Sequence, residues 1–229
     1  MKMSDAKSHQ AAAPADRTFS FRAVGIVFIA CVCGWFMMQL EILGVRILVT
    51  DFGSAVYVTG SVIGVFLLSL SIGYMLGGWL CGKVNTWTLL GTLMIVVGIC
   101  KCLIPFVTEP VSNMIFDTGI DEKWGALLAS LILFGAPTIL LGIVSPNVVH
   151  WLTIRTGNSG FSAGLVLATS TLASFSGCVV TSFYLVLYSL RATLFISGIA
   201  LTVFGAVVLV TTMRSAQKCS QCDTIGVEQ

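Results

Sequence analysis

Charged side chains are scarce in this chain. Its 229 residues include 12 basic and 10 acidic ones, 10% in all, whereas 56% are apolar or aromatic. The mean hydropathy is +0.98. Soluble domains carry about 25% charged residues, so the composition excludes an ordinary cytosolic enzyme, a nucleic-acid-binding protein and a disordered chain. It predicts an integral membrane protein whose surroundings are the lipid bilayer.

The sequence also lacks motifs that carry catalysis or hold a cofactor. It has no glycine-rich cofactor loop after a strand and no HExxH. Six of its eight cysteines fall within apolar runs, where a thiol behaves as a small hydrophobe, so no disulfide framework is expected. The other two form Cys219-x-x-Cys222, which supplies two of the four ligands of a zinc site and is the one weak metal candidate. We expect no catalytic residue and no cofactor, and we lean against an enzyme.

What the sequence does have is long hydrophobic runs. A membrane-spanning helix needs about 20 apolar residues. Six such runs are separated by charges, prolines and turn residues, at 23–48, 56–82, 87–106, 124–150, 161–188 and 191–213. We therefore predict an all-α, polytopic bundle of six transmembrane helices over residues 23–213, with tails at 1–22 and 214–229. Helical spacing of Val111, Met114 and Ile115 predicts a short surface helix near 110–119.

Basic residues indicate which side of the membrane each end occupies, because Lys and Arg favour the cytoplasmic side. With six spans, one side receives Lys2, Lys7, Arg17, Arg22, Lys83, Arg155, Arg214 and Lys218. The other side receives Arg46, Lys101, Lys123 and Arg191. Both tails are therefore predicted to be cytoplasmic.

Small residues recur one turn apart in the second run, which allows helices to approach closely. The residues expected to serve helix packing are Gly60, Gly64, Gly73, Gly77 and Gly78. Packing within the chain, a homodimer seam and a moving gate are the three interpretations. In the fifth run Ser170, Ser174 and Thr181 share one face, which can pack against another helix or line a solute path.

Charges inside the spans are costly and therefore informative. At 1.5 Å per residue, Glu41 lies about 25 Å along the first helix and Lys101 about 21 Å along the third. We hypothesise that Glu41 and Lys101 pair across helices or face one polar cavity; the alternative is that each extends separately to the interface. Arg46 is five residues from Glu41 and is poorly placed to pair with it.

The fourth run contains Pro137 and the sequence Ser145-Pro146-Asn147. Proline removes a backbone donor and frees a carbonyl one turn earlier, so such helices kink or open. Broken helices are where transporters often place their sites. Ser145 and Asn147 are therefore candidate solute-binding residues, with a structural kink as the alternative.

Four segments resemble a known family: 41–46 (EILGVR), 51–67 (DFGSAVYVTGSVIGVFL), 73–78 (GYMLGG) and 137–146 (PTILLGIVSP). They are similar to the membrane domain that is fused ahead of spermidine synthase in many bacterial proteins and is described as similar to the major facilitator transporters. The resemblance covers roughly residues 35–190. It implies a bacterial inner membrane and a fold like half of a major facilitator. The fused relatives continue into a soluble aminopropyltransferase domain that is not in this sequence.

The resemblance and the in-span charges together predict a transporter-like protein that handles a small solute, a polyamine or a related amine, with a homodimer completing the path. The expected solute-binding residues are Glu41, Arg46, Lys101, Ser145, Asn147, Ser170, Ser174 and Thr181. The alternative is a non-transporting scaffold that anchors a separately encoded, soluble spermidine synthase-like enzyme at the cytoplasmic face.

Overall fold

The computed structural model describes residues 17–53 and 55–225, with side chains from 22–53 and 56–214. Within this part of the chain, six long helices and one 3₁₀ turn account for all regular structure. They are α1 (Arg17–Phe52), α2 (Ala55–Leu80), α3 (Thr86–Asp117), α4 (Glu122–Thr156), α5 (Ser159–Phe183), η1 (Leu185–Leu187) and α6 (Leu190–Ile225). All six helices are long and apolar enough to cross a membrane, which confirms the predicted all-α bundle.

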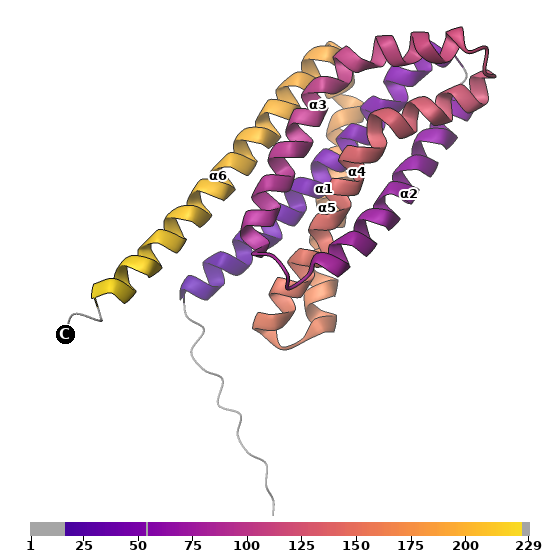
Figure 1. Ribbon diagram of the computed structural model, residues 1–229. Helices are drawn as coiled ribbons and strands as arrows, with labels where there is room; N and C mark the ends of the chain where they lie inside the picture. Colours follow the sequence, from indigo (N-terminus) through magenta and orange to yellow (C-terminus); the bar gives the residue numbers. More distant parts are fainter. Residues whose placement is uncertain (1–16, 54, 226–229) are drawn as a thin grey trace, which may run out of the picture.

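The helices alternate in direction, so the start of α1 and the end of α6 lie at the same end of the bundle (Figure 1). We call this end proximal and the opposite end distal. The α1–α2, α3–α4 and α5–α6 connections are distal. The proximal end is the one predicted to face the cytoplasm.

Helix pairs that pack most closely are not neighbours in sequence: α2 lies against α4, α3 against α6, and α1 against α5. Small residues make each contact possible. A Cβ added to Gly73 would lie 2.4 Å from the Ile139 carbonyl oxygen, and one added to Gly98 would lie 2.7 Å from the Gly198 carbonyl oxygen. These three close pairs define the bundle, whereas α1 and α3 approach each other only loosely.

Two apolar clusters fill the interior, one toward each end. The proximal cluster is built around Ile26, Met94 and Val148. The distal cluster is built around Leu43 and Phe134, and adjoins Gly44, whose added Cβ would lie 2.9 Å from the Phe134 ring. Both clusters contain residues of α1, α3, α4 and α6, so each end of the bundle has a core shared by these four helices.

Most of the segment near 110–119, where the sequence predicts a short surface helix, is helical and continuous with α3. Residues 110–117 are the last two turns of α3, which continues past Pro105 and Pro110 and ends at Asp117, and Gly119 (φ +67°) lies in the short connection to α4. Proline bends a helix without necessarily ending it, because only one hydrogen bond is lost at each ring. The last turns of α3 and the first turns of α4 accordingly run at an angle to the rest of each helix (Figure 1).

Candidate functional site

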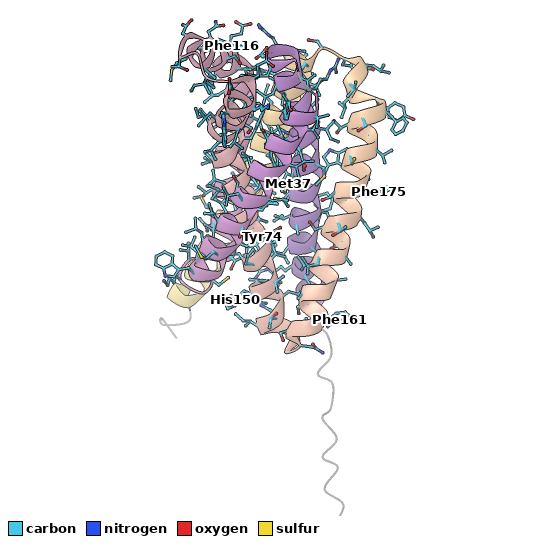
Figure 2. All side chains as sticks on the ribbon, turned by 90° about the vertical axis from the view of Figure 1, so that its right-hand side faces the viewer. Met37, Tyr74, Phe116, His150, Phe161 and Phe175 are labelled. Carbon is cyan, nitrogen blue, oxygen red and sulfur yellow. The ribbon has the colours of Figure 1, made fainter. Side chains whose placement is uncertain are left out.

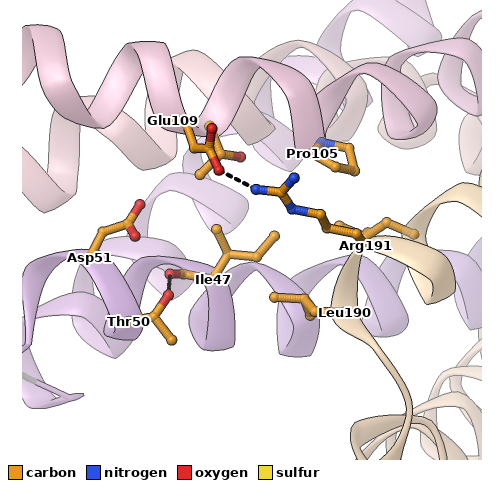
Figure 3. Close-up of a pocket in the computed structure, with 9 residues that line it drawn as sticks. Ile47, Thr50, Asp51, Pro105, Glu109, Leu190 and Arg191 are labelled. Carbon is orange, nitrogen blue, oxygen red and sulfur yellow. Dashed lines mark hydrogen bonds and ion pairs between the residues drawn. The ribbon is translucent and has the colours of Figure 1, made fainter.

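A cavity of about 130 Å³ opens at the distal end between α1, α3 and α6 (Figure 3). Its lining consists of Ile47, Thr50, Asp51, Pro105, Thr108, Glu109, Leu190, Arg191 and Leu194. Its apolar lining consists of Ile47, Pro105, Leu190 and Leu194. The charged side chains of Asp51, Glu109 and Arg191 lie at its rim. This volume is sufficient for a small molecule or several waters.

The α1 wall is held in place by hydrogen bonds at the end of the helix. Ser112 Oγ donates to Asp51 Oδ2 at 2.6 Å, which ties the end of α1 to α3. Thr50 Oγ1 donates to the Ile47 carbonyl oxygen at 2.5 Å. Asp51 keeps its other carboxylate oxygen without a hydrogen-bond partner among the residues that the structure describes. That oxygen is available to a ligand.

Glu109 and Arg191 form an ion pair across the cavity mouth. Figure 3 shows the Arg191 guanidinium reaching from the start of α6 toward Glu109 on α3, with Asp51 on the far side. Both side chains of the pair are 69% exposed, so the pair contributes only about 0–1 kcal/mol to stability. The lining holds two carboxylates, Asp51 and Glu109, and one guanidinium, which pairs with Glu109, so it has an excess of negative charge.

Lys101 lies deeper along the same seam between α1 and α3. Its side chain is fully buried, and Nζ donates to Gln39 Oε1 at 2.9 Å. The ammonium also lies 4.7 Å from the centre of the Phe36 ring. Lys101, Pro105 and Thr108 follow one another at helical spacing on one face of α3 and are all buried, but only Pro105 and Thr108 line the cavity.

The structure does not bring Glu41 and Lys101 together. Lys101 bonds Gln39 instead, and Glu41 is half-buried with no hydrogen-bond or ion-pair partner in the described part of the chain. Residues two apart on a helix point about 200° apart. Because α1 turns Gln39 toward α3, it turns Glu41 away from Lys101.

Arg46 has a structural contact at the distal end. Its Nη1 donates to the carbonyl oxygen of Val186, in the 3₁₀ turn that leads into α6. This contact holds the start of α6, and with it Arg191, near the end of α1. Arg46 does not line the cavity.

The hydroxyl face of α5 packs against α1. A Cβ on Gly34 would lie 2.7 Å from the Ser170 carbonyl oxygen and 2.7 Å from Ser174 Oγ, and Ser170 Oγ donates to the Ala30 carbonyl oxygen at 3.3 Å. Thr181 is fully buried on the same face, and its hydroxyl has no hydrogen-bond partner among the described residues. The structure thus places these three residues in a helix contact, away from the cavity.

Ser145 and Asn147 lie in a helix that stays continuous through Pro137 and Pro146. Asn147 Nδ2 donates to the carbonyl oxygens of Ile143 at 2.8 Å and Gly77 at 3.2 Å, so its amide group joins α4 to α2. Ser145 is half-buried. The expected opening of the helix near Pro146 is not seen, because the Asn147 amide and the close contact with Gly77 brace this turn.

The five glycines of α2 fall into two groups. Gly73 and Gly77 lie against the backbone of α4 at Ile139 and Ile143. A Cβ added at Gly60, Gly64 or Gly78 would meet no atom within 4 Å. The outer face of α5 is also open, and Phe161 (62% exposed) and Phe175 (67% exposed) project from it (Figure 2). These open faces meet lipid or another protein.

Sequence reasoning missed Asp51, Glu109 and Arg191. Each stands at a helix end or bend, where a charge is ordinarily an interfacial group. The signal that could have found them is the pair of prolines at 105 and 110, because a bend of α3 turns Glu109 over the bundle instead of into the loop.

Metal ligands do not cluster in the described residues: no group of three or more His, Cys, Asp or Glu side chains there could hold an ion. The side chains of Cys219 and Cys222 lie outside the described residues. Comparison of the chain with protein-family models, curated proteins and solved structures finds no match.

Proposed function

We propose that this membrane protein is transporter-like and binds a small cationic solute, an amine or polyamine, in the distal cavity. The observation that supports this most is a cavity of about 130 Å³ lined by two carboxylates, Asp51 and Glu109, and by one guanidinium, Arg191, which pairs with Glu109. An ammonium group forms charge-assisted hydrogen bonds to carboxylates. The carboxylate role that the sequence suggested for Glu41 therefore passes to Asp51 and Glu109.

The apolar walls suit the carbon chain of an aliphatic amine. Ile47, Leu190 and Leu194 face the same cavity as the two carboxylates. A site with an apolar body and a few polar groups at one side orients a ligand that is itself charged at one end. Anions are disfavoured there, because only one of the three charged groups is basic.

The proposed setting is a bacterial inner membrane with both tails in the cytoplasm, so that the cavity faces outward. Six helices equal half of a major facilitator fold, and a second copy would complete an alternating-access path. The open outer face of α5, with Phe161 and Phe175, is where that copy would pack. We propose the homodimer as part of the same function.

Binding of 1,4-diaminobutane to the purified protein in lipid nanodiscs tests this proposal. Asp51→Asn and Glu109→Gln should each weaken binding about 10- to 100-fold, because a hydrogen bond to a charged group contributes about 1.5–3 kcal/mol. Glu122→Gln is the matched control, since Glu122 is an exposed distal carboxylate outside the cavity lining. Equal affinity in the wild type and both cavity variants would refute the site.

If the protein is instead a non-transporting scaffold, the wild-type protein should bind no diamine. A soluble aminopropyltransferase should then be captured through residues 214–229. Uptake of the diamine into proteoliposomes separates a transporter from a protein that only binds.

A further inference from the structure

A second opening at the distal end lies between α2 and α4, and the proposed solute site does not use it. Its volume is about 380 Å³, and it shares no lining residue with the cavity between α1, α3 and α6. We call it the lateral groove. Residues of two helices line it, among them Tyr57, Gly60 and Ser61 of α2 and Lys123, Trp124 and Leu127 of α4.

The groove is open where α2 and α4 no longer touch. Deeper in the bundle the two helices pack closely through Gly73 and Gly77 of α2, whereas a Cβ added at Gly60 would meet no atom within 4 Å. The two aromatic side chains of the lining, Tyr57 and Trp124, are 48% and 63% exposed. The groove is therefore accessible to whatever surrounds the bundle.

The groove lies at the level expected for the boundary between lipid headgroups and hydrocarbon. Tyr57 and Lys123 belong to the first turns of α2 and α4, which both begin at the distal end (Figure 1). Trp and Tyr are enriched at this boundary, where their rings lie at headgroup level. Gly64 on α2 and Leu131 on α4 follow the lining residues at helical spacing, toward the bilayer interior. A ligand in the groove would therefore meet headgroups at one end and hydrocarbon at the other.

Lys123 gives the groove its charge. It is the one charged side chain of the lining, and its Nζ lies 4.9 Å from the centre of the Tyr57 ring. Asp121 and Glu122 precede it in the chain but do not line the groove. Within the described residues no carboxylate pairs with the Lys123 ammonium. The groove thus combines one uncompensated positive charge with apolar walls.

We infer that the lateral groove binds an anionic phospholipid such as phosphatidylglycerol. The Lys123 ammonium donates charge-assisted hydrogen bonds to the phosphodiester, and an acyl chain lies over Gly60 along the groove. Basic pockets between transmembrane helices bind anionic lipid headgroups. A lipid with a single negative charge matches the single positive charge of the lining, whereas phosphatidylcholine brings a cation of its own. The inference is independent of the proposed solute site.

Native mass spectrometry of the whole chain, titrated with dioleoyl phosphatidylglycerol, tests the headgroup contact. This probe should bind about fivefold more tightly than dioleoyl phosphatidylcholine, because one basic side chain near the membrane surface favours an anionic lipid by roughly that factor. Lys123→Gln should abolish the preference, and Lys123→Arg, which keeps the charge, should retain it. Lys83→Gln is the matched control, since Lys83 also lies over an aromatic ring, Trp79, but at the proximal end.

The same titration tests the path of the acyl chain. Gly60→Leu should weaken binding of the probe about tenfold, because the leucine side chain displaces about two methylene groups of the lipid. Gly78→Leu is the control on the same helix and should leave the affinity unchanged, since Gly78 is equally open but does not line the groove. Both variants are expected to fold, because a Cβ at either position overlaps nothing in the bundle.

Other outcomes would overturn the inference. Equal affinity for the two lipids, or a preference that survives Lys123→Gln, would mean that Lys123 holds no lipid phosphate. Release of the probe by millimolar glycerol phosphate, which has no acyl chains, would mean that the groove binds free phosphate esters. A dimer that is lost in Gly60→Leu but not in Gly78→Leu, with unchanged affinity for the lipid, would assign the groove to a second copy of the chain.

Discussion

At the scale of single residues, the polar groups of the interior are bound mainly to one another and to backbone carbonyls. Asn147 donates to two carbonyl oxygens and Lys101 to Gln39, so both are part of the packing. In lipid an unsatisfied polar group costs several kcal/mol, which explains why these buried side chains have hydrogen-bond partners. Glu41, Thr138 and Thr181 are exceptions, since their side chains have no hydrogen-bond partner in the part of the chain that the structure describes.

The contact between Lys101 and Gln39 predicts a coupled effect on stability. Gln39→Leu should lower the free energy of unfolding by about 1.5–3 kcal/mol, because the buried ammonium loses its acceptor. When Lys101→Met is already present, the same change should cost at least about 1 kcal/mol less. Reversible unfolding in mixed micelles measures the four proteins of this cycle.

The control for this cycle pairs Glu41→Gln with Lys101→Met. Since Glu41 does not contact Lys101, the two effects should add within about 0.5 kcal/mol. A coupling larger than 1 kcal/mol between Glu41 and Lys101, with none between Gln39 and Lys101, would contradict the described side-chain arrangement.

At the scale of helices, close approach occurs where small residues of two helices coincide. Gly73 meets Gly142 across α2 and α4, and Gly98 meets Gly198 across α3 and α6. The sequence alone predicts that α2 has glycines one turn apart, but not which of them face a partner. Which glycines face a partner depends on the rotation of the helix about its axis, and the sequence of one helix does not determine that rotation.

This difference between glycines can be tested by adding a methyl group. Gly73→Ala should destabilise the protein by about 1–3 kcal/mol, because its Cβ would overlap the carbonyl of Ile139. Gly78→Ala should be neutral or stabilising by up to about 1 kcal/mol, since the added Cβ meets no atom and alanine favours the helix.

Thermal unfolding of both variants in the same detergent gives the comparison. Equal loss of stability at the two positions would mean that Gly78 is also covered, for instance by a second copy. The measurement therefore also tests which face of α2 remains open in the bilayer.

At the scale of the whole molecule, the number and type of elements follow from composition, whereas the site does not. Hydropathy and length predicted six helices because a bilayer allows few alternatives. The depth of Lys101 could be estimated by counting residues, but its partner could not, since Gln39 and Glu41 lie two residues apart and the rotation of α1 decides which of them faces α3. The cavity depends on the bend of α3, and prolines predict a bend without its direction.

The orientation of the bundle in the membrane stays a prediction, and it decides whether the distal cavity faces outward. We expect Asn113→Cys, at the distal end, to react with a membrane-impermeant maleimide in intact cells. Ser159→Cys, at the proximal end, should react only after the membrane is broken. Both positions are exposed, so access to the reagent is the only difference between them.

The Cys81 thiol should interfere little with this measurement. Burial raises the pKa of the Cys81 thiol at the proximal end, so less of it is the reactive thiolate at neutral pH. The unmodified chain, labelled in parallel, gives the background from its own cysteines. Labelling of Ser159→Cys but not of Asn113→Cys in intact cells would mean that the proximal end faces outward. The carboxylates of the distal cavity would then face the cytoplasm.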